Sequence, residues 1–338
     1  MKTFVIAEAG ANHDRDRKKA SRLIKVAAAS GAAAIKFQLY KSSSLYVKST
    51  GDIGKFKNVS DLIRSIELPR EWLHDLVKEC DDNGVEFMCT PFDEDAINAL
   101  VSVGVKRMKI AAFEATDVKF VEKIAATNLP IIFSAGIGST LDSVKKTIEI
   151  IRLNNDKEIC VLHCNSSYPT PYRDINLGQM ILLRDSLKEM NVSIGISDHT
   201  LGTLIPPIAV THGAKVVEKH FTLDRNGGGP DDSFSLEPRD LSALVQGVRT
   251  AWEALGSVNH ALKPSELENI QFRRSLYFVQ PLKAGDTITH ESVRSVRPGF
   301  GLAPKYFEKI VGTKVTIDVE WGTPVTAEAL SISLQPGQ

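Results

Sequence analysis

Two histidines end two successive predicted strands, and this placement suits a metal site. "SIGISDH" closes on His199, and "KVVEKHF" carries His220 one residue before its end. At one edge of a parallel sheet, two imidazoles can bind a divalent cation and leave positions open for water or substrate. Asp198 and Glu218 stand beside them in the sequence. A single histidine here would be interpreted as a hydrogen-bonded packing residue, but the pair on adjacent strands favours the metal.

The second of these strands contains three consecutive ionisable residues, Glu218, Lys219 and His220. Burying an unpaired charge is costly, so the strand is either an exposed edge or ends in a site that supplies partners. Side chains two residues apart on a strand face the same side, which places Glu218 with His220 and Lys36 with Gln38.

Cations and hydroxyl groups stand at the ends of five other predicted strands, and Glu8 stands at the end of the first. Together they suit a phosphate and a carboxylate, because lysine supplies positive charge and hydroxyls supply hydrogen-bond donors. The alternative is that each lysine extends to solvent at the rim. The set comprises Lys36, Thr90, Lys109, Ser134 and Ser166.

These residues are brought together only if the strands share one sheet. A short apolar run followed by a helical stretch recurs eight times, with predicted strands at 3–10, 33–39, 85–92, 107–112, 130–136, 158–164, 193–199 and 215–221. This alternation predicts a parallel sheet, and eight units within residues 1–258 match a (β/α)8 TIM barrel, whose active site lies at the carboxyl ends of the strands. A doubly wound open sheet is the alternative.

The composition changes after the predicted barrel. Residues 259–274 are polar and predicted to be a linker, and residues 275–338 have short strands and many turns. "KAGDTITHESV" is imperfectly repeated by "EWGTPVTAEAL", which suggests a small, pseudo-symmetric β domain. A domain of this size has a small core, so we expect it to pack against another surface.

Composition and charge exclude several other classes of protein. Lys plus Arg and Asp plus Glu both number 41, which gives no basic excess for nucleic acid. No apolar stretch is long enough for a membrane span, and no signal peptide is evident, so we expect a cytoplasmic protein with four reduced cysteines. The first strand is not followed by a dinucleotide fingerprint, and no phosphate-binding P-loop motif occurs.

Several motifs resemble the sialic acid (N-acetylneuraminate) synthase family. They are "EAGANH", "IKFQ", "TPFD", "KIAAFE", "SSYPTP", "ISDHTLG", "VEKHFTLD" and "RPGFGLAP", in family order. The resemblance implies a TIM barrel with a C-terminal antifreeze-like (SAF, β-clip) domain. It also implies metal-dependent condensation of phosphoenolpyruvate with an N-acetylated hexosamine, giving a nine-carbon 2-keto acid and phosphate for cell-surface carbohydrate.

The resemblance also assigns roles to individual residues. His199 and His220 match the family's metal ligands, with Mn2+ as the expected ion and Mg2+ or Co2+ as alternatives. Glu8 matches an acidic residue near the reacting carbons, and we expect Glu8 or Glu218 to move the proton of the water that adds during the reaction. The phosphoenolpyruvate positions match Lys36, Thr90, Lys109, Ser134 and Ser166, and the sugar positions match Gln38, Tyr168, Glu218 and Asp231. Arg297 matches an arginine that reaches the sugar in the partner subunit's barrel, which implies a domain-swapped homodimer.

Some residues depart from the family pattern. Ala112 stands where many relatives have serine, which removes one hydroxyl. "AAFEATD", "GGGPDDSFSL" and "VRSVRPGFGLAPKY" resemble the pseudaminic acid branch, which uses a 2,4-diacetamido-2,4,6-trideoxyhexose rather than N-acetylmannosamine. Two alternatives stay open, namely another phosphoenolpyruvate-condensing or aldolase-type barrel and a non-catalytic sugar-binding barrel.

Overall fold

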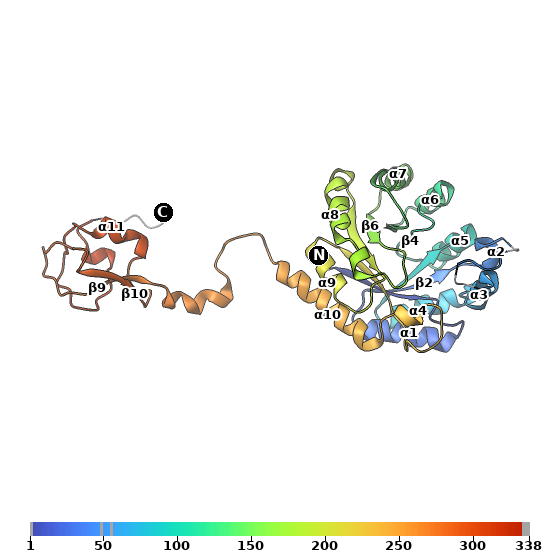
Figure 1. The fold of residues 1–338 in the computed structure, drawn as a ribbon, viewed down its shortest axis with the longest axis horizontal. Helices are drawn as coiled ribbons and strands as arrows, with labels where there is room; N and C mark the ends of the chain where they lie inside the picture. The colour runs from blue at the N-terminus through green and yellow to red at the C-terminus, as the bar shows by residue number, and fades with distance from the viewer. Residues whose placement is uncertain (1–2, 48–49, 55–56, 333–338) are drawn as a thin grey trace. The chain divides into compact units, whose positions relative to one another are not determined.

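A computed structural model describes residues 3–47, 50–54 and 57–332. The chain divides into two compact units, Met1–Gly256 and Ser257–Gln338 (Figure 1). Each unit is described by itself below.

The first unit is built on eight parallel strands. They are β1 (Phe4–Gly10), β2 (Ala34–Leu39), β3 (Glu86–Pro91), β4 (Met108–Ile110), β5 (Ile131–Ala135), β6 (Ile159–Cys164), β7 (Ser193–Asp198) and β8 (Val216–His220). Hydrogen bonds join them in the order β3-β2-β1-β8-β7-β6-β5-β4, and β3 and β4 lie side by side, so the sheet nearly closes on itself. The predicted TIM barrel is therefore confirmed, and the open-sheet alternative is not.

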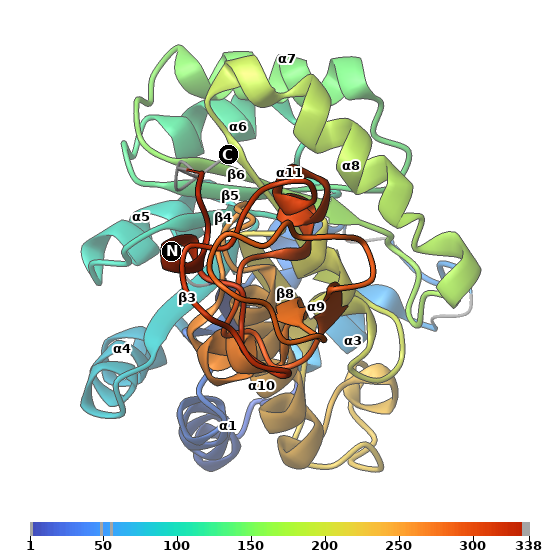
Figure 2. The ribbon, with the colours of Figure 1, turned by 90° about the vertical axis from the view of Figure 1, so that its left-hand side faces the viewer.

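Helices surround these strands (Figure 2). The main ones are α1 (Arg17–Ala29), α4 (Leu73–Asp82), α5 (Glu94–Ser102), α6 (Val118–Ala125), α7 (Leu141–Arg152), α8 (Leu177–Ser186), α9 (Ile205–Thr211) and α10 (Pro238–Leu255), with the short α2 (Ser42–Leu45) and α3 (Val59–Ser65) after β2. Side chains of Asp16, Asp93, Asp117 and Thr140 accept hydrogen bonds from the first turns of α1, α5, α6 and α7. Each such cap contributes about 1 kcal/mol and fixes where a helix begins.

The interior of the barrel changes character along its axis. An apolar cluster fills the part nearer the amino ends of the strands and contains Ile6, Ala34, Met88, Ile132, Cys160, Leu162 and Val216. Gly195 lies in this region, where a Cβ atom would be only 2.3 Å from the carbonyl oxygen of Val216. Glycine therefore permits the close approach of β7 and β8. The layer above, at the carboxyl ends, is polar and charged.

The second unit has its own small core. β9 (Ser275–Phe278) pairs antiparallel with β10 (Val293–Val296), and Leu276, Phe278, Ile288, Val315 and Val325 are among its buried residues. An isolated bridge pairs Leu282 with Val319, the residues just before the two repeated segments. A second bridge pairs Val315 with Leu330, the last residue of the second segment. Within the predicted linker, residues Pro264–Phe272 form an exposed 3-10 helix. The unit also contains the short helix α11 (Phe307–Ile310).

Candidate active site

A cavity opens at the carboxyl ends of the strands, where the barrel architecture places active sites. Every strand contributes at least one lining residue at or just beyond its carboxyl end. The predicted site residues that line it are Glu8, Lys36, Gln38, Thr90, Lys109, Ser134, Tyr168, His199, Glu218 and His220. Residues scattered over more than 200 positions of the chain therefore share one cavity.

Three predicted residues lie outside this lining. Asp231 is beside it, with Oδ2 3.8 Å from Nδ1 of His220. Ser166 lines a neighbouring cavity of about 410 Å³ at the ends of β5 and β6, together with Asn165 and Gln179. Arg297 belongs to the second unit, where it directly follows β10 and is exposed.

Lys36 is the centre of a buried charge network. Its Nζ lies 2.7 Å from Oε2 of Glu8 and 3.6 Å from Oε2 of Glu218, and it donates to Oγ1 of Thr90 at 3.0 Å. Gln38 donates to Oε1 of Glu8 at 3.1 Å. The register explains the contact, because Glu8 lies opposite Lys36 on β2 and opposite His220 on β8. Two carboxylates therefore share one ammonium group inside the protein.

The two carboxylates differ in how readily they hold a proton. Burial raises the pKa of Glu8 to about 7, although Lys36 opposes the rise and Glu218 adds to it. Burial would also raise the pKa of Glu218, but Lys109, Lys36 and a hydrogen bond from Ser197 hold that pKa below its ordinary value. Paired groups with opposite shifts are typical of acid–base sites, and here Glu8 is the group that can exchange a proton near neutral pH.

Lys109 lies on the other side of the cavity from β1. Its Nζ donates to Oγ of Ser134 at 2.8 Å and to the carbonyl oxygen of Ile110 at 3.0 Å, and lies 3.9 Å from Oε1 of Glu218. Burial lowers the pKa of Lys109. Two buried lysines with hydroxyls beside them supply hydrogen-bond donors that can hold an anion, and Glu8 and Glu218 lie within the same network.

His199 and His220 lie together at the mouth, with ring centroids 5.4 Å apart. His199 directs Nδ1 at the carbonyl oxygen of Asn165, at 2.7 Å, which leaves Nε2 available as a ligand atom. Nδ1 of His220 is buried and has no hydrogen-bond partner among the described residues. Burial lowers the pKa of both imidazoles, and a neutral imidazole is the form that binds a metal.

These two donors fit a divalent cation that completes its coordination with water or substrate. Within residues 3–47, 50–54 and 57–332, no three His, Cys, Asp or Glu side chains converge as a ready metal site.

Two ionisable residues near the strand ends do not line the cavity. Asp198 is not beside the histidines in space, because alternation along the strand turns it to the outside of the barrel, where it pairs with Lys219. His13 also lies away from the cavity, packed near the rings of Phe37 and Trp72, because it belongs to the turn after β1 rather than to the strand.

One further residue of the site was not predicted from the sequence. Ser197 lines the cavity and donates to Oε1 of Glu218 at 2.9 Å. Its position two residues before His199 on β7 is the signal that could have found it. Glu114, in the turn after β4, does not line the cavity, although its Oε2 is buried without a hydrogen-bond partner among the described residues and burial raises the pKa of this carboxyl to about 6.

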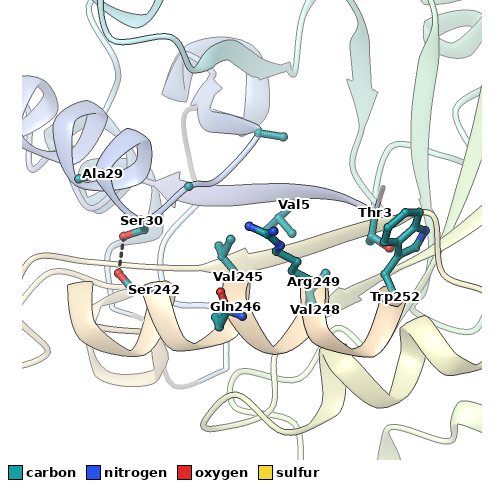
Figure 3. Close-up of a pocket in the computed structure, with 12 residues that line it drawn as sticks. Thr3, Val5, Ala29, Ser30, Ser242, Val245, Gln246, Val248, Arg249 and Trp252 are labelled. Atoms are coloured by element: carbon teal, nitrogen blue, oxygen red, sulfur yellow. Dashed lines mark hydrogen bonds between the residues drawn. The ribbon is translucent and has the colours of Figure 1, made fainter. Parts of the chain in front are cut away.

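A further cavity of about 330 Å³ lies between α10 and the turn after α1 (Figure 3). It is lined by Thr3 and Ala33, at the amino ends of β1 and β2, and Trp252 contributes to its wall. Ser242 donates to Oγ of Ser30 across it at 3.1 Å. This cavity is at the opposite end of the strands from the charged network, so it is not the reaction site.

Comparison with known proteins identifies the family of this chain. The NeuB family model matches residues 23–260 and the SAF domain model matches residues 273–331. An N,N'-diacetyllegionaminic acid synthase of Legionella pneumophila is 37% identical, over 97% of this chain and 94% of that protein. A pseudaminic acid synthase of Campylobacter jejuni is also 37% identical, over 95% of this chain and 94% of that protein.

A solved structure agrees with these matches. An N-acetylneuraminic acid synthetase of Leptospira borgpetersenii superimposes with a TM-score of 0.73 at 32% identity, covering 80% of this chain and 90% of that one. The chain belongs to the NeuB family and is a phosphoenolpyruvate-dependent nonulosonic acid synthase, with a TIM barrel followed by a SAF domain.

Proposed function

We propose that the second substrate is a 2,4-diacetamido-2,4,6-trideoxyhexose and that the residues predicted above carry its condensation with phosphoenolpyruvate. We choose this sugar because several sequence motifs resemble those of the pseudaminic acid branch. Relatives named for legionaminic and pseudaminic acid are both 37% identical to this chain, which supports a nonulosonic acid but leaves N-acetylmannosamine as the alternative.

The single observation that carries the proposal is the shared cavity, in which two buried lysines, two carboxylates and two imidazoles meet. Lys36 and Lys109 neutralise the phosphate and the carboxylate of phosphoenolpyruvate, and Thr90 and Ser134 supply hydroxyl donors from the same cavity. Ser166 would supply a third from the neighbouring cavity at the ends of β5 and β6. Fixing both anionic groups positions the methylene carbon for attack on the sugar carbonyl. Ala112 lines the same cavity and contributes no hydroxyl.

His199 and His220 would hold a divalent cation, with Mn2+ as the expected ion and Mg2+ or Co2+ as alternatives. When bound, such an ion supplies Lewis-acid polarisation of the sugar carbonyl. Gln38, Tyr168, Glu218 and Asp231 orient the sugar from the same side of the barrel. Tyr168 is placed for this role, since its ring centroid lies 4.3 Å from that of His199.

The proton chemistry falls to Glu8, with Glu218 remaining ionised. Attack by the methylene carbon forms the new C–C bond and leaves positive charge on the carbon that bears the phosphate. The oxygen of the sugar carbonyl takes up a proton and becomes a hydroxyl. Water adds to the carbon that bears the phosphate and gives one proton to Glu8, which balances the proton taken up by the sugar. The second proton of the water leaves with phosphate as the C–O bond to phosphate breaks and the 2-keto group forms. A carboxylate with a pKa near neutrality is suited to this transfer.

We propose that the chain forms a domain-swapped homodimer, in which the SAF domain of one copy covers the mouth of the barrel of the other. Large apolar side chains are exposed on loops after the strands, including Phe113 (58%), Ile137 (60%) and Leu204 (64%). The SAF unit also exposes apolar side chains, Phe300 (65%) and Trp321 (73%), and the exposed Arg297. Exposed apolar surface of this kind marks interaction sites.

The proposal is tested by incubating the protein with Mn2+, phosphoenolpyruvate and each candidate hexosamine, and measuring phosphate and 2-keto acid together. We expect both products, in equal amounts, with the diacetamido sugar. Product from N-acetylmannosamine alone would contradict the proposed sugar. If no phosphate is released with either sugar while phosphoenolpyruvate still binds, the result would support the non-catalytic alternative.

A further inference from the structure

We propose that the buried Lys219–Asp198 pair is a positioning device for the two histidines, distinct from the residues that touch substrate. Lys219 is 1% exposed and Asp198 is fully buried, and Nζ lies 2.7 Å from Oδ2. Both side chains face away from the cavity, because they alternate with Glu218, His220 and Ser197. The inference rests on the proposed metal site.

Lys219 holds the chain on both sides of His199. It pairs with Asp198, the residue before His199, and donates to the carbonyl oxygen of Thr200, the residue after it. Asp198 completes the arrangement by accepting from the backbone N–H of Thr200 at 3.0 Å and from its hydroxyl at 3.1 Å. The backbone that carries His199 is therefore held at its two flanking residues.

The same lysine directly precedes His220 in the sequence, so one side chain links the backbone next to His220 with the backbone on both sides of His199. Lys219 and Asp198 lie opposite each other in the parallel register of β8 and β7. The pair therefore holds the relative position of the two strand ends, and with it the separation of the two rings. Outer partners of this kind set ligand orientation in metal sites, and their loss costs about 10- to 100-fold in metal affinity.

Stability alone does not account for the pair. Replacing a buried ion pair by apolar residues of similar volume is often neutral or stabilising, because desolvation offsets the attraction. An apolar pair would match the surrounding packing but would direct no hydrogen bond to Thr200. What the charged pair adds is fixed geometry next to His199.

The test is the double variant Asp198→Val/Lys219→Met, which removes both charges and changes the side-chain volume little. Binding of Mn2+ to the metal-free protein is measured without substrate, by the electron paramagnetic resonance signal of the free ion, alongside circular dichroism melting. We expect the Mn2+ dissociation constant to rise about tenfold or more while the protein stays folded. At saturating Mn2+, we expect turnover to recover, because the substrate-binding groups are unchanged.

A second ion pair provides a matched control. Arg107 binds Glu86 through two contacts of 2.6 and 3.1 Å and likewise links two neighbouring strands, but at their amino ends. The variant Glu86→Leu/Arg107→Met should leave Mn2+ affinity unchanged. Equal losses in both double variants would show a general effect of removing charge and would overturn the inference.

The remaining outcomes are also decisive. If the double variant does not fold, Asp198→Asn keeps the volume and an acceptor for Thr200, and it should weaken Mn2+ binding about threefold. Unchanged affinity in whichever of these variants is folded would overturn the positioning role alone. Failure of the unaltered protein to bind Mn2+ would instead overturn the proposed metal site, and the positioning role with it.

Discussion

Both faces of strands β7 and β8 carry buried charged side chains, but the two faces differ in how completely these side chains are hydrogen-bonded. On the outer face, Lys219 and Asp198 have hydrogen-bond partners for all their polar atoms. On the inner face, Oε2 of Glu218 and Nδ1 of His220 are buried without a hydrogen-bond partner among the described residues. An unsatisfied buried polar atom costs about 1–3 kcal/mol, so the inner face carries a cost that the outer face avoids.

This difference in hydrogen bonding separates charged groups that are fully paired within the protein from groups that keep an atom free for a ligand. A satisfied pair specifies one arrangement of the backbone, while unsatisfied acceptors are available to a ligand. The inner face is therefore prepared for a substrate or ion that supplies the missing partners. Substitutions on the two faces should separate activity from stability, and the following predictions are arranged by expected effect.

The largest effect is expected on the inner face at His220. His220→Ala should reduce metal-dependent turnover by at least about a thousandfold, because half of the protein's metal donors are removed. The melting temperature should change little, since the imidazole satisfies no other group. Product formation at several Mn2+ concentrations measures the loss, and turnover that is independent of added metal would contradict the assignment.

On the outer face, Lys219→Met should lower the stability of the protein in addition to its affinity for Mn2+. It leaves Asp198 buried without its cation, and breaking a buried pair in this way costs about 3–5 kcal/mol. Urea unfolding of the variant measures the change. A loss below 1 kcal/mol would show that Thr200 alone satisfies Asp198 and would weaken the contrast between the faces.

Glu8→Gln should change activity and stability in opposite directions, lowering kcat and raising stability at pH 8. We expect kcat to fall about 100-fold, and the decline of kcat/KM below pH 7 to disappear, because the titrating base has been removed. The pKa of Glu8 is raised to about 7, so its contribution to stability is full below its ordinary pKa of 4.5 and is lost as the pH rises through 7.

The neutral glutamine should therefore stabilise the protein at pH 8, by about 2 kcal/mol. Unfolding curves at pH 5 and pH 8 check the sign. A variant that is less stable than the unaltered protein at pH 8 would show that ionised Glu8 stabilises the fold through Lys36.

The smallest effect is expected at the rim. Ile137 has φ of +43°, a left-handed conformation that is strained for a β-branched residue, and its side chain is 60% exposed. Ile137→Asn should raise stability by about 1 kcal/mol, because asparagine tolerates this conformation. If the side chain contacts a partner, the same variant should weaken dimerisation, which sedimentation at several concentrations would measure.

The sequence allowed the barrel and most of the cavity to be predicted, because both depend on local periodicity. Strand alternation placed Lys36 with Gln38 and Glu218 with His220, and both pairs line the cavity. The same rule turns Asp198 outward, where it pairs with Lys219. The positions of Ser166 and Asp231, which lie on loops outside the cavity lining, could not be predicted, since loop geometry depends on packing between distant segments.

No described helix has both the length and the apolar character needed to cross a membrane.

The apolar floor of the barrel has a consequence for proton traffic. Ile6, Met88, Leu162 and Val216 lie beneath the charged layer and offer no polar atoms through which a chain of water could run to the far end. In the proposed mechanism, protons exchanged by Glu8 would therefore pass through the mouth that substrates also use. Bound substrate would close that route, and the proton gained by Glu8 would stay on it until product departs.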